Sequence, residues 1–236
     1  MTTYGYEDLT ALIARMSGDE KHDAASFSTL DVLWTLYDEV LDVAPERVDD
    51  PERDRFLLSK GHGPMAYYAV LAAKGFVRLA ELDTWLTFGS RLGGHPDNTL
   101  IPGVEISSGS LGHGLGLAVG TAIGLAVQGR TRPRVVVLVG DGELDEGSNA
   151  EAIQYAARAG LGSLTAVVVD NESAQHGWPG GIAARFEVEG WTAQDVDGHN
   201  RAALAEALGR QPAARREAVP HVVVAHTEPE LDEEDR

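Results

Sequence analysis

The stretch from residue 135 to residue 177 constrains the fold more than any other part of the sequence. Residues 135–139 form an apolar, β-branched run, which is typical of a strand buried on both faces of a parallel sheet. A second such run, residues 164–169, follows a segment with apolar residues at helical spacing, namely Ala150, Ile153, Ala157 and Leu161. Because β-α-β units of this kind are right-handed and keep their strands parallel, we expect an α/β fold, a parallel sheet with helices on both faces.

Each of these two strands ends abruptly in polar residues. Asp141, between two glycines, follows the first strand, and Asn171 and Ser173 follow the second. Since open α/β sheets bind ligands at the carboxyl ends of their strands, Asp141 and Asn171 should emerge at the same edge. Carboxylate, amide and carbonyl oxygens are ligands of the kind that Mg²⁺ or Ca²⁺ takes, with a diphosphate completing the shell. Either residue alone also fits an ordinary turn, and only the pair indicates a metal site.

The segment GDGELDEGSNAEA, residues 140–152, together with Asn171 resembles the thiamine-diphosphate motif of the transketolase family. The resemblance implies that Asp141 and Asn171 bind Mg²⁺ (or Ca²⁺) through their side chains and Ser173 through its carbonyl. Gly142 would lie next to the diphosphate of thiamine diphosphate. One local difference is that the family's usual Asp two positions before the metal-binding Asn is Val169 here.

The segment LLSKGHG, residues 57–63, resembles a second motif of the family, in which the histidine faces the cofactor. The resemblance therefore assigns His62 to cofactor binding and catalysis. From the residues alone, a capping or surface histidine beside a glycine turn is the favoured interpretation. Pro64 is well placed as the first residue of a helix through residue 73.

Two further histidines match the family less completely. GGHPD, residues 93–97, resembles a loop whose histidine hydrogen-bonds substrate hydroxyls, so His95 takes that role by resemblance. His22 lies where the family has Gly-His-Pro-Gly, but Lys21 and Asp23 flank it here.

Glycines recur at every fourth residue from position 112 to position 124 and should form one stripe of a helix. We expect a buried core helix rather than a membrane span, because the apolar run is only about 17 residues long and contains a histidine. In the family, the backbone at the start of this helix touches the aminopyrimidine of the cofactor. The resemblance gives that role to Gly109 and Leu111, and it places His113, where the family has Gln, near the catalytic site.

The remaining sequence predicts several further elements. We expect a short helix over residues 7–16, a helix starting at Ser28 with Asp31 in an approximate capping box, and a loop over residues 177–181. A helix over residues 201–208 and a buried strand over residues 221–225 should follow. We interpret residues 1–227 as one diphosphate-binding domain. Residues 228–236, with six acids among nine residues, should form a solvated acidic tail.

Charge and composition exclude several classes of function. With a net charge of −18, the chain is not expected to bind nucleic acid or an anionic membrane, and it would need a metal ion to hold a diphosphate. The absence of cysteine excludes disulfides and thiolate nucleophiles and fits a cytoplasmic enzyme. The first residues lack the basic and apolar regions of a signal peptide.

The resemblance covers residues 22–225 and only the diphosphate-binding half of a transketolase. It implies the N-terminal subunit of a split transketolase, which transfers a two-carbon ketol unit from a ketose to an aldose with thiamine diphosphate and Mg²⁺. The partner would be a C-terminal subunit with the pyrimidine-binding domain, in a heterotetramer, and the substrates would be sugars or sugar phosphates. Glu146 and Glu151 would lie near the interface between copies, unless they only form a solvated helix start.

Two alternatives remain open from the sequence. One is a split thiamine-diphosphate decarboxylase or carboligase of a specialised pathway. The other is a non-catalytic regulatory subunit, which is favoured by Val169, by the flanks of His22 and by an ending that lacks the family's Lys-Gly-x-Gly. The presence of Asp141, Asn171, His62 and His95 argues against that second alternative.

Overall fold

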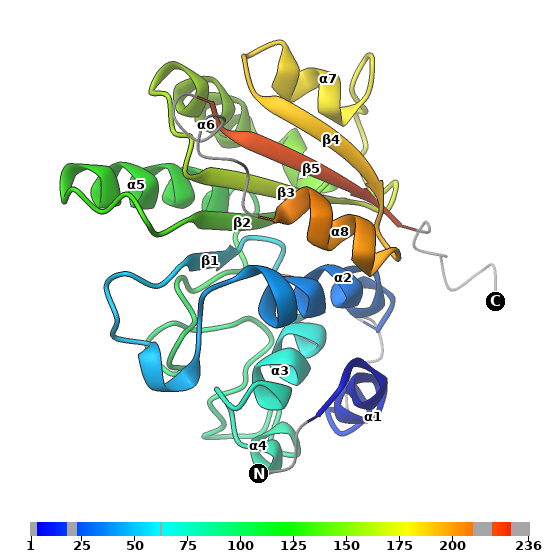
Figure 1. The fold of residues 1–236 in the computed structure, drawn as a ribbon. Helices are drawn as coiled ribbons and strands as arrows, with labels where there is room; N and C mark the ends of the chain where they lie inside the picture. Colours follow the sequence, from blue (N-terminus) through cyan, green and yellow to red (C-terminus); the bar gives the residue numbers. More distant parts are fainter. Residues whose placement is uncertain (1–3, 18–22, 62, 210–218, 228–236) are drawn as a thin grey trace.

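The structure, a computed structural model, describes residues 4–17, 23–61, 63–209 and 219–227. These residues form a parallel sheet of five strands in the order β1-β2-β3-β5-β4 (Figure 1). The strands are β1 (Arg55–Leu58), β2 (Val135–Gly140), β3 (Leu164–Asp170), β4 (Thr192–Asp197) and β5 (His221–His226). The expected α/β fold with a parallel sheet is confirmed.

Helices cover both faces of this sheet, as the sequence predicted (Figure 1). On one side of the sheet, α2 (Asp23–Thr35), α3 (Pro64–Ala73) and α8 (Arg201–Leu208) share a core with it, and α1 (Leu9–Ile13) and α4 (Leu79–Leu82) pack against α3. The other side packs against α5 (His113–Val127), α6 (Gly147–Arg158) and α7 (Ile182–Glu187). Short helical turns complete the described elements: η1 (Tyr6–Asp8), η3 (Leu36–Val40), η4 (Pro45–Arg47) and η5 (Gly142–Asp145).

The alternation of side chains along β2 explains its continuous apolar sequence. Val135, Val137 and Val139 belong to the core on the α5 and α6 side, whereas Val136 and Leu138 belong to the core under α2 and α3. Because both faces of the strand are covered, every position must be apolar. The pairing of Gly140 with Val169 then brings the ends of β2 and β3 side by side.

The helix predictions are confirmed for α3, which begins at Pro64, and for α8, but the predicted start of α2 is wrong. This helix begins at Asp23, so Ser28 and Asp31 lie inside it and do not form a capping box. Both side chains have tertiary partners instead. Ser28 Oγ accepts a hydrogen bond from Lys60 Nζ at 3.2 Å, and Asp31 Oδ2 lies 3.0 Å from His199 Nδ1.

Helix α5 is buried on one face only, which corrects the expectation of a helix buried within the core. Leu115, Ala118 and other apolar residues pack onto the sheet. The stripe formed by Gly116, Gly120 and Gly124 faces away from it, since a Cβ added at any of these glycines would meet no atom of the described chain within 4 Å. None of the described helices is long and apolar enough to cross a bilayer.

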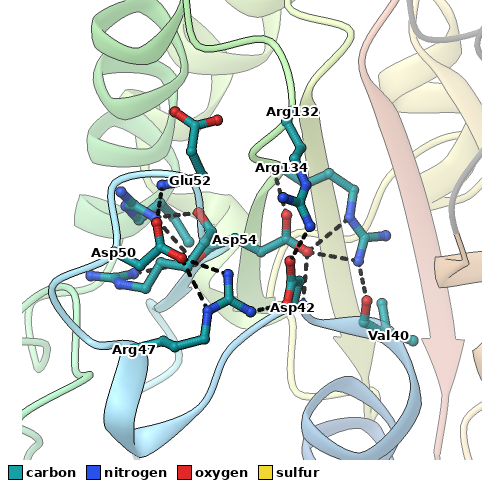
Figure 2. A network of polar contacts seen from close by, with 10 residues as sticks. Val40, Asp42, Arg47, Asp50, Glu52, Asp54, Arg132 and Arg134 are labelled. Atoms are coloured by element: carbon teal, nitrogen blue, oxygen red, sulfur yellow. Dashed lines mark hydrogen bonds and ion pairs between the residues drawn. The ribbon is translucent and has the colours of Figure 1, made fainter.

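The amino-terminal edge of the sheet is closed by a buried ion pair (Figure 2). Asp54 precedes β1 and Arg134 precedes β2; the Arg134 backbone donates to Asp54 Oδ1 at 2.8 Å, and its guanidinium donates to Oδ2 at 3.0 Å. The guanidinium also donates to the carbonyls of Val40 and, at 3.1 Å, Leu208. The pair and its partners therefore belong to four separate segments of the chain, which these contacts hold together.

Candidate active site

Asp141 and Asn171 lie at the opposite, carboxyl-terminal edge of the sheet, directly beyond β2 and β3. The Asp141 backbone N–H extends the ladder by donating to the Val169 carbonyl at 3.0 Å. Both side chains are buried, with 0% of Asp141 and 2% of Asn171 exposed. The structure therefore places the two residues on neighbouring strands at one edge, as the sequence predicted.

The polar atoms of these residues differ in their hydrogen bonding. Asp141 Oδ1 accepts from Ser173 Oγ at 2.6 Å, and Oδ2 accepts from the Ala174 N–H at 2.9 Å. Asn171 Oδ1 is buried but has no hydrogen-bond partner among the described residues. A buried carbonyl oxygen without a donor is costly, so this atom marks a position that suits a cation or another donor.

The turn at Gly142 brings the third predicted ligand to the same place. A Cβ added at Gly142 would lie 3.2 Å from Ser173 Oγ and 3.3 Å from the Ser173 carbonyl oxygen. Any larger residue at position 142 would therefore push against the 173 turn. The Ser173 turn therefore lies against the Asp141–Gly142 turn, and Asn171 follows the neighbouring strand β3. The oxygen atoms of Asp141, Asn171 and the Ser173 carbonyl are of the kinds that a Mg²⁺ ion with a diphosphate would take.

Within the described residues, no group of three or more His, Cys, Asp or Glu side chains could hold a metal ion alone. The donor set at the strand ends contains one carboxylate, one amide and one carbonyl, so it needs ligand oxygens to complete an octahedral shell. A diphosphate supplies such oxygens and carries the negative charge that a divalent cation balances. The residues present therefore fit a metal–diphosphate pair better than a metal alone.

A cavity of about 530 Å³ opens at this edge. Its wall combines the glycine turn, acidic side chains and one lysine: Lys60, Leu111, Gly140, Gly142, Glu143, Asp145, Glu146, Ser173, Gln175 and His176. The glycines allow a ligand to approach the backbone closely. The site is thus a polar hollow with room for a ligand of cofactor size.

One buried acid of this wall, Glu143, accepts several hydrogen bonds. Its carboxylate accepts hydrogen bonds from the Gly112 N–H at 2.9 Å, the Ser59 hydroxyl, and the Gly140 N–H at 3.4 Å. Burial raises the pKa of Glu143, whereas these donors and the positive charge of Lys60 act in the opposite direction.

The histidine predicted to bind substrate hydroxyls lies against two of the glycine motifs. A Cβ added at Gly109 would lie 2.9 Å from the His95 ring, and one added at Gly61 would lie 3.0 Å from it. Gly109 has φ = 123°, a conformation that favours glycine. Residues that are far apart in the sequence therefore meet around the exposed His95 side chain.

The other predicted residues are divided between the cavity and its surroundings. Leu111 lines the cavity, whereas His113 is exposed at the start of α5 and is not part of the wall. Glu146 also lines it, and Glu151 is exposed on α6. His22, His62 and the predicted acidic tail lie outside the described residues, so their assignments, and the domain boundary at residue 227, stay predictions.

The sequence analysis missed several residues of the wall. Ser59 and Lys60 belong to LLSKGHG, and Glu143 belongs to GDGELDEG, but in these motifs roles were assigned only to His62, Asp141, Gly142 and Glu146. The signal that would have found Glu143 is an acid on a buried turn, which requires donors nearby. Gln175 and His176 reach the cavity only because Asp145 Oδ2 accepts from the Gln175 N–H at 3.1 Å, and no local pattern predicts that contact.

Comparisons with known proteins agree with this geometry. A family model described as "Transketolase, thiamine diphosphate binding domain" matches residues 11–228. "Ferredoxin fas2" of Rhodococcoides fascians is 61% identical over 209 residues, covering 89% of this chain and 69% of that protein. One of the subunits of an apulose-4-phosphate transketolase of Actinobacillus succinogenes is 37% identical over 213 residues, covering 87% of this chain and 75% of that protein.

A solved structure, the transketolase from Leishmania mexicana, superposes with a TM-score of 0.74 at 26% sequence identity. The match covers 96% of this chain and 37% of that chain. The present chain therefore spans little more than a third of the length of that transketolase.

Proposed function

This chain belongs to the family of the transketolase thiamine-diphosphate-binding domain, and we propose on that premise that it is the diphosphate-binding subunit of a two-component transketolase. It would act with thiamine diphosphate and Mg²⁺, and transfer a two-carbon ketol unit from a ketose to an aldose. The observation that carries the proposal is the buried, unsatisfied Asn171 Oδ1 just beyond β3, next to the end of β2 that Asp141 follows.

In this proposal the chain holds the diphosphate end of the cofactor. Asp141, Asn171 and the Ser173 carbonyl would bind the Mg²⁺ ion, and Ser173 Oγ, which donates to Asp141 at 2.6 Å, would keep the carboxylate oriented. Gly142 would let the diphosphate approach the backbone. The Gly109 and Leu111 backbone would contact the aminopyrimidine at the other end of the cofactor.

When bound, the cofactor supplies a nucleophilic thiazolium carbon that can attack a ketose carbonyl. The chain's own contribution is to exclude water, to orient substrates and to move protons. The exposed His95 ring, which lies against Gly61 and Gly109, would hydrogen-bond substrate hydroxyls. By resemblance, His62 would bind the cofactor and act in catalysis and His22 would act in catalysis, and the exposed His113 would lie at the periphery.

A partner chain with the pyrimidine-binding domain is part of this proposal. The Actinobacillus succinogenes relative is named as one subunit of a transketolase and is 37% identical to this chain over most of its length. The uncovered glycine stripe of α5 supports close helix packing against a neighbouring chain in a heterotetramer. Glu146 on the cavity wall and the exposed Glu151 of α6 would lie near that interface, and a cytoplasmic location completes the proposal.

The substrates we propose are sugars or sugar phosphates. The name of the Actinobacillus succinogenes relative describes a transketolase acting on apulose-4-phosphate, which is a phosphorylated sugar. The name of the Rhodococcoides fascians relative describes a ferredoxin, but the present chain holds no cysteine and so offers no thiolate ligand for an iron–sulfur cluster. That name therefore adds nothing to the chemistry proposed for this chain.

The experiment is to co-express the chain with a pyrimidine-domain subunit encoded beside it and to titrate thiamine diphosphate by calorimetry, with Mg²⁺ or with EDTA. We expect Mg²⁺-dependent binding and two-carbon transfer from a ketose to an aldehyde. Asp141→Ala should abolish the binding, because it removes the only carboxylate of the proposed donor set. Binding that is unchanged in Asp141→Ala would defeat the metal assignment, and decarboxylation of a 2-oxoacid without ketol transfer would replace the proposed reaction.

A further inference from the structure

We propose that Glu143 is a positioning residue that fixes the separation of the two backbone segments holding opposite ends of the cofactor. One segment is the turn at Asp141 and Gly142, and the other is the Gly109–Leu111 stretch before α5. The inference rests on the proposed function, because it assumes that these segments hold the diphosphate and the aminopyrimidine. It adds a role for a buried acid that the proposed chemistry does not otherwise use.

The carboxylate joins three separate parts of the chain. Glu143 Oε1 accepts from the Gly112 N–H at 2.9 Å and from the hydroxyl of Ser59, which lies just beyond β1. The Glu143 backbone is itself fixed, because its carbonyl accepts from Asn149 Nδ2 at 2.6 Å. The bridge therefore runs from the β2 turn through one side chain to the start of α5.

The direction of each hydrogen bond follows from the neighbouring donors. Ser59 Oγ accepts from the Gly114 N–H at 2.9 Å, so its own proton is directed at Glu143. Glu143 Oε1 thus accepts hydrogen bonds from two donors. It also lies at the amino end of the 15-residue helix α5, where the helix dipole favours a negative charge.

The start of α5 is closely packed against the segments that this bridge joins. A Cβ added at Gly114 would lie 2.3 Å from Ser59 Cβ, and one added at Gly112 would lie 2.4 Å from Ser148 Oγ. The start of α5 is therefore pressed against the end of β1. The length of the Glu143 side chain then sets how far Leu111 stands from the Asp141 turn.

The contacts are tighter on the α5 side than on the β2 side. The Gly112 N–H lies at 2.9 Å, whereas the Gly140 N–H lies at 3.4 Å from the carboxylate. Loss of the bridge should therefore displace the α5 segment more than the diphosphate turn. The affinity for a ligand that contacts both segments should therefore fall more than the affinity for a ligand that contacts the diphosphate turn alone.

The experiment compares two ligands on the complete two-subunit enzyme. Thiamine diphosphate spans both segments, whereas inorganic pyrophosphate reaches only the metal turn, and both are titrated with Mg²⁺ by calorimetry. The variants are Glu143→Met, which keeps a side chain of similar length but removes both acceptor oxygens, and the milder Ser59→Ala, which removes one of the two donors to Oε1. Glu206→Gln on the exposed surface of α8 is the control.

We expect Glu143→Met to weaken thiamine diphosphate binding about tenfold, the equivalent of one hydrogen bond to a charged group, and pyrophosphate binding less than about threefold. Ser59→Ala should show the same selectivity, and the double variant should lose little more than the worse single one, because both residues act through one bridge. Glu206→Gln should change neither affinity.

Equal weakening of both ligands in Glu143→Met would show a purely structural role and overturn the inference. Unchanged thiamine diphosphate affinity in both Glu143→Met and Ser59→Ala would overturn it as well. If the unmodified enzyme binds neither ligand, the proposed function itself fails, and this inference fails with it. The two failures are distinguishable, because the first is seen only in variants of an enzyme that binds its cofactor.

Discussion

The two edges of the sheet differ in whether all the buried polar atoms named below have hydrogen-bond partners. At the amino-terminal edge, Asp54 accepts from the Arg134 backbone and guanidinium and from the Asp42 N–H at 3.0 Å (Figure 2). At the carboxyl-terminal edge, Asn171 Oδ1 and Asp145 Oδ1 are buried without a hydrogen-bond partner among the described residues. Both edges belong to the same strands, so the difference does not come from the fold.

This difference indicates that one edge contributes mainly to stability and the other to ligand binding. A satisfied buried network adds rigidity and ties segments together, and removing one partner from it is expensive. An unsatisfied buried oxygen costs the folded chain free energy, and a bound cation can recover that cost. The amino-terminal edge is therefore a structural clamp, and the carboxyl-terminal edge is shaped for a ligand.

The largest effect is expected from a substitution that breaks the buried Asp54–Arg134 ion pair. Arg134→Met leaves the Asp54 carboxylate, which is 1% exposed, buried without its counter-charge, and should lower the free energy of unfolding by about 3 to 5 kcal/mol. Urea denaturation measures the loss. The control is Arg132→Gln, whose side chain is 60% exposed and should cost less than about 1 kcal/mol. Equal losses in the two variants would mean that the pair is no clamp.

The opposite edge should respond in the opposite way. Asn171→Ala should change the unfolding free energy of the isolated chain by less than about 1 kcal/mol, because its oxygen has no bond in the described chain to lose. In the complete enzyme the same variant should lose the stabilisation by Mg²⁺ and thiamine diphosphate, about 2.7 kcal/mol at a concentration of 100 times the Kd.

Asn200→Ala is the matched control for that experiment. Asn200 caps α8 by accepting from the Ala203 N–H at 3.1 Å, so its loss should cost about 1 kcal/mol and leave the ligand effect intact. An Asn171→Ala enzyme that keeps the full stabilisation by the ligand would place the metal elsewhere.

A substitution on the outer face of α5 should affect the isolated chain and the assembled enzyme in opposite ways. Gly120→Leu should stabilise the isolated chain by up to about 1 kcal/mol, since leucine favours helix and nothing in the described chain lies within 4 Å. In the assembled enzyme the added side chain should block close packing, and light scattering should show dissociation. Ala126→Leu, exposed on the same helix but off the glycine stripe, should leave the assembly intact. An intact complex in Gly120→Leu would remove α5 from the interface.

The smallest effect is expected at the border of the carboxyl-terminal site. His113 is exposed and does not line the cavity, so His113→Gln should alter the KM for the ketose by about threefold at most. Steady-state kinetics over a range of ketose and cofactor concentrations measure the effect. If cofactor affinity, turnover and KM are all unchanged, His113 does not belong to the site.

The parts of the fold that the sequence predicted are those in which local and long-range signals agree. The apolar runs of β2 and β3 and the proline at the start of α3 predicted these elements correctly. The start of α2 was wrong, because Ser28 takes Lys60 as its partner rather than capping a helix. Strand β1 was missed because it spans only four residues after a charged loop, and β5 lies between β3 and β4, an order that no local pattern contains.

In the candidate site, the sequence predicted the residues at the strand ends but not the contacts between distant segments. The positions of Asp141 and Asn171 follow from the strand ends, and the structure places both at one edge. Residues whose role depends on contacts between segments, such as Glu143 with Ser59 and Gly112, were not predicted. Sequence patterns show which residue types are present, whereas the partners of a buried acid are set by the packing of distant segments.

The central claim is that Asp141, Asn171 and the Ser173 carbonyl share one divalent ion at the carboxyl-terminal edge. The most direct measurement is a crystal structure of the complete enzyme with Mn²⁺ and thiamine diphosphate, with data collected to locate manganese by anomalous scattering. We predict one manganese site on these three oxygen ligands, at about 2.1 to 2.2 Å from each. A manganese site on other residues, or diphosphate bound at this edge without any metal, would contradict the account.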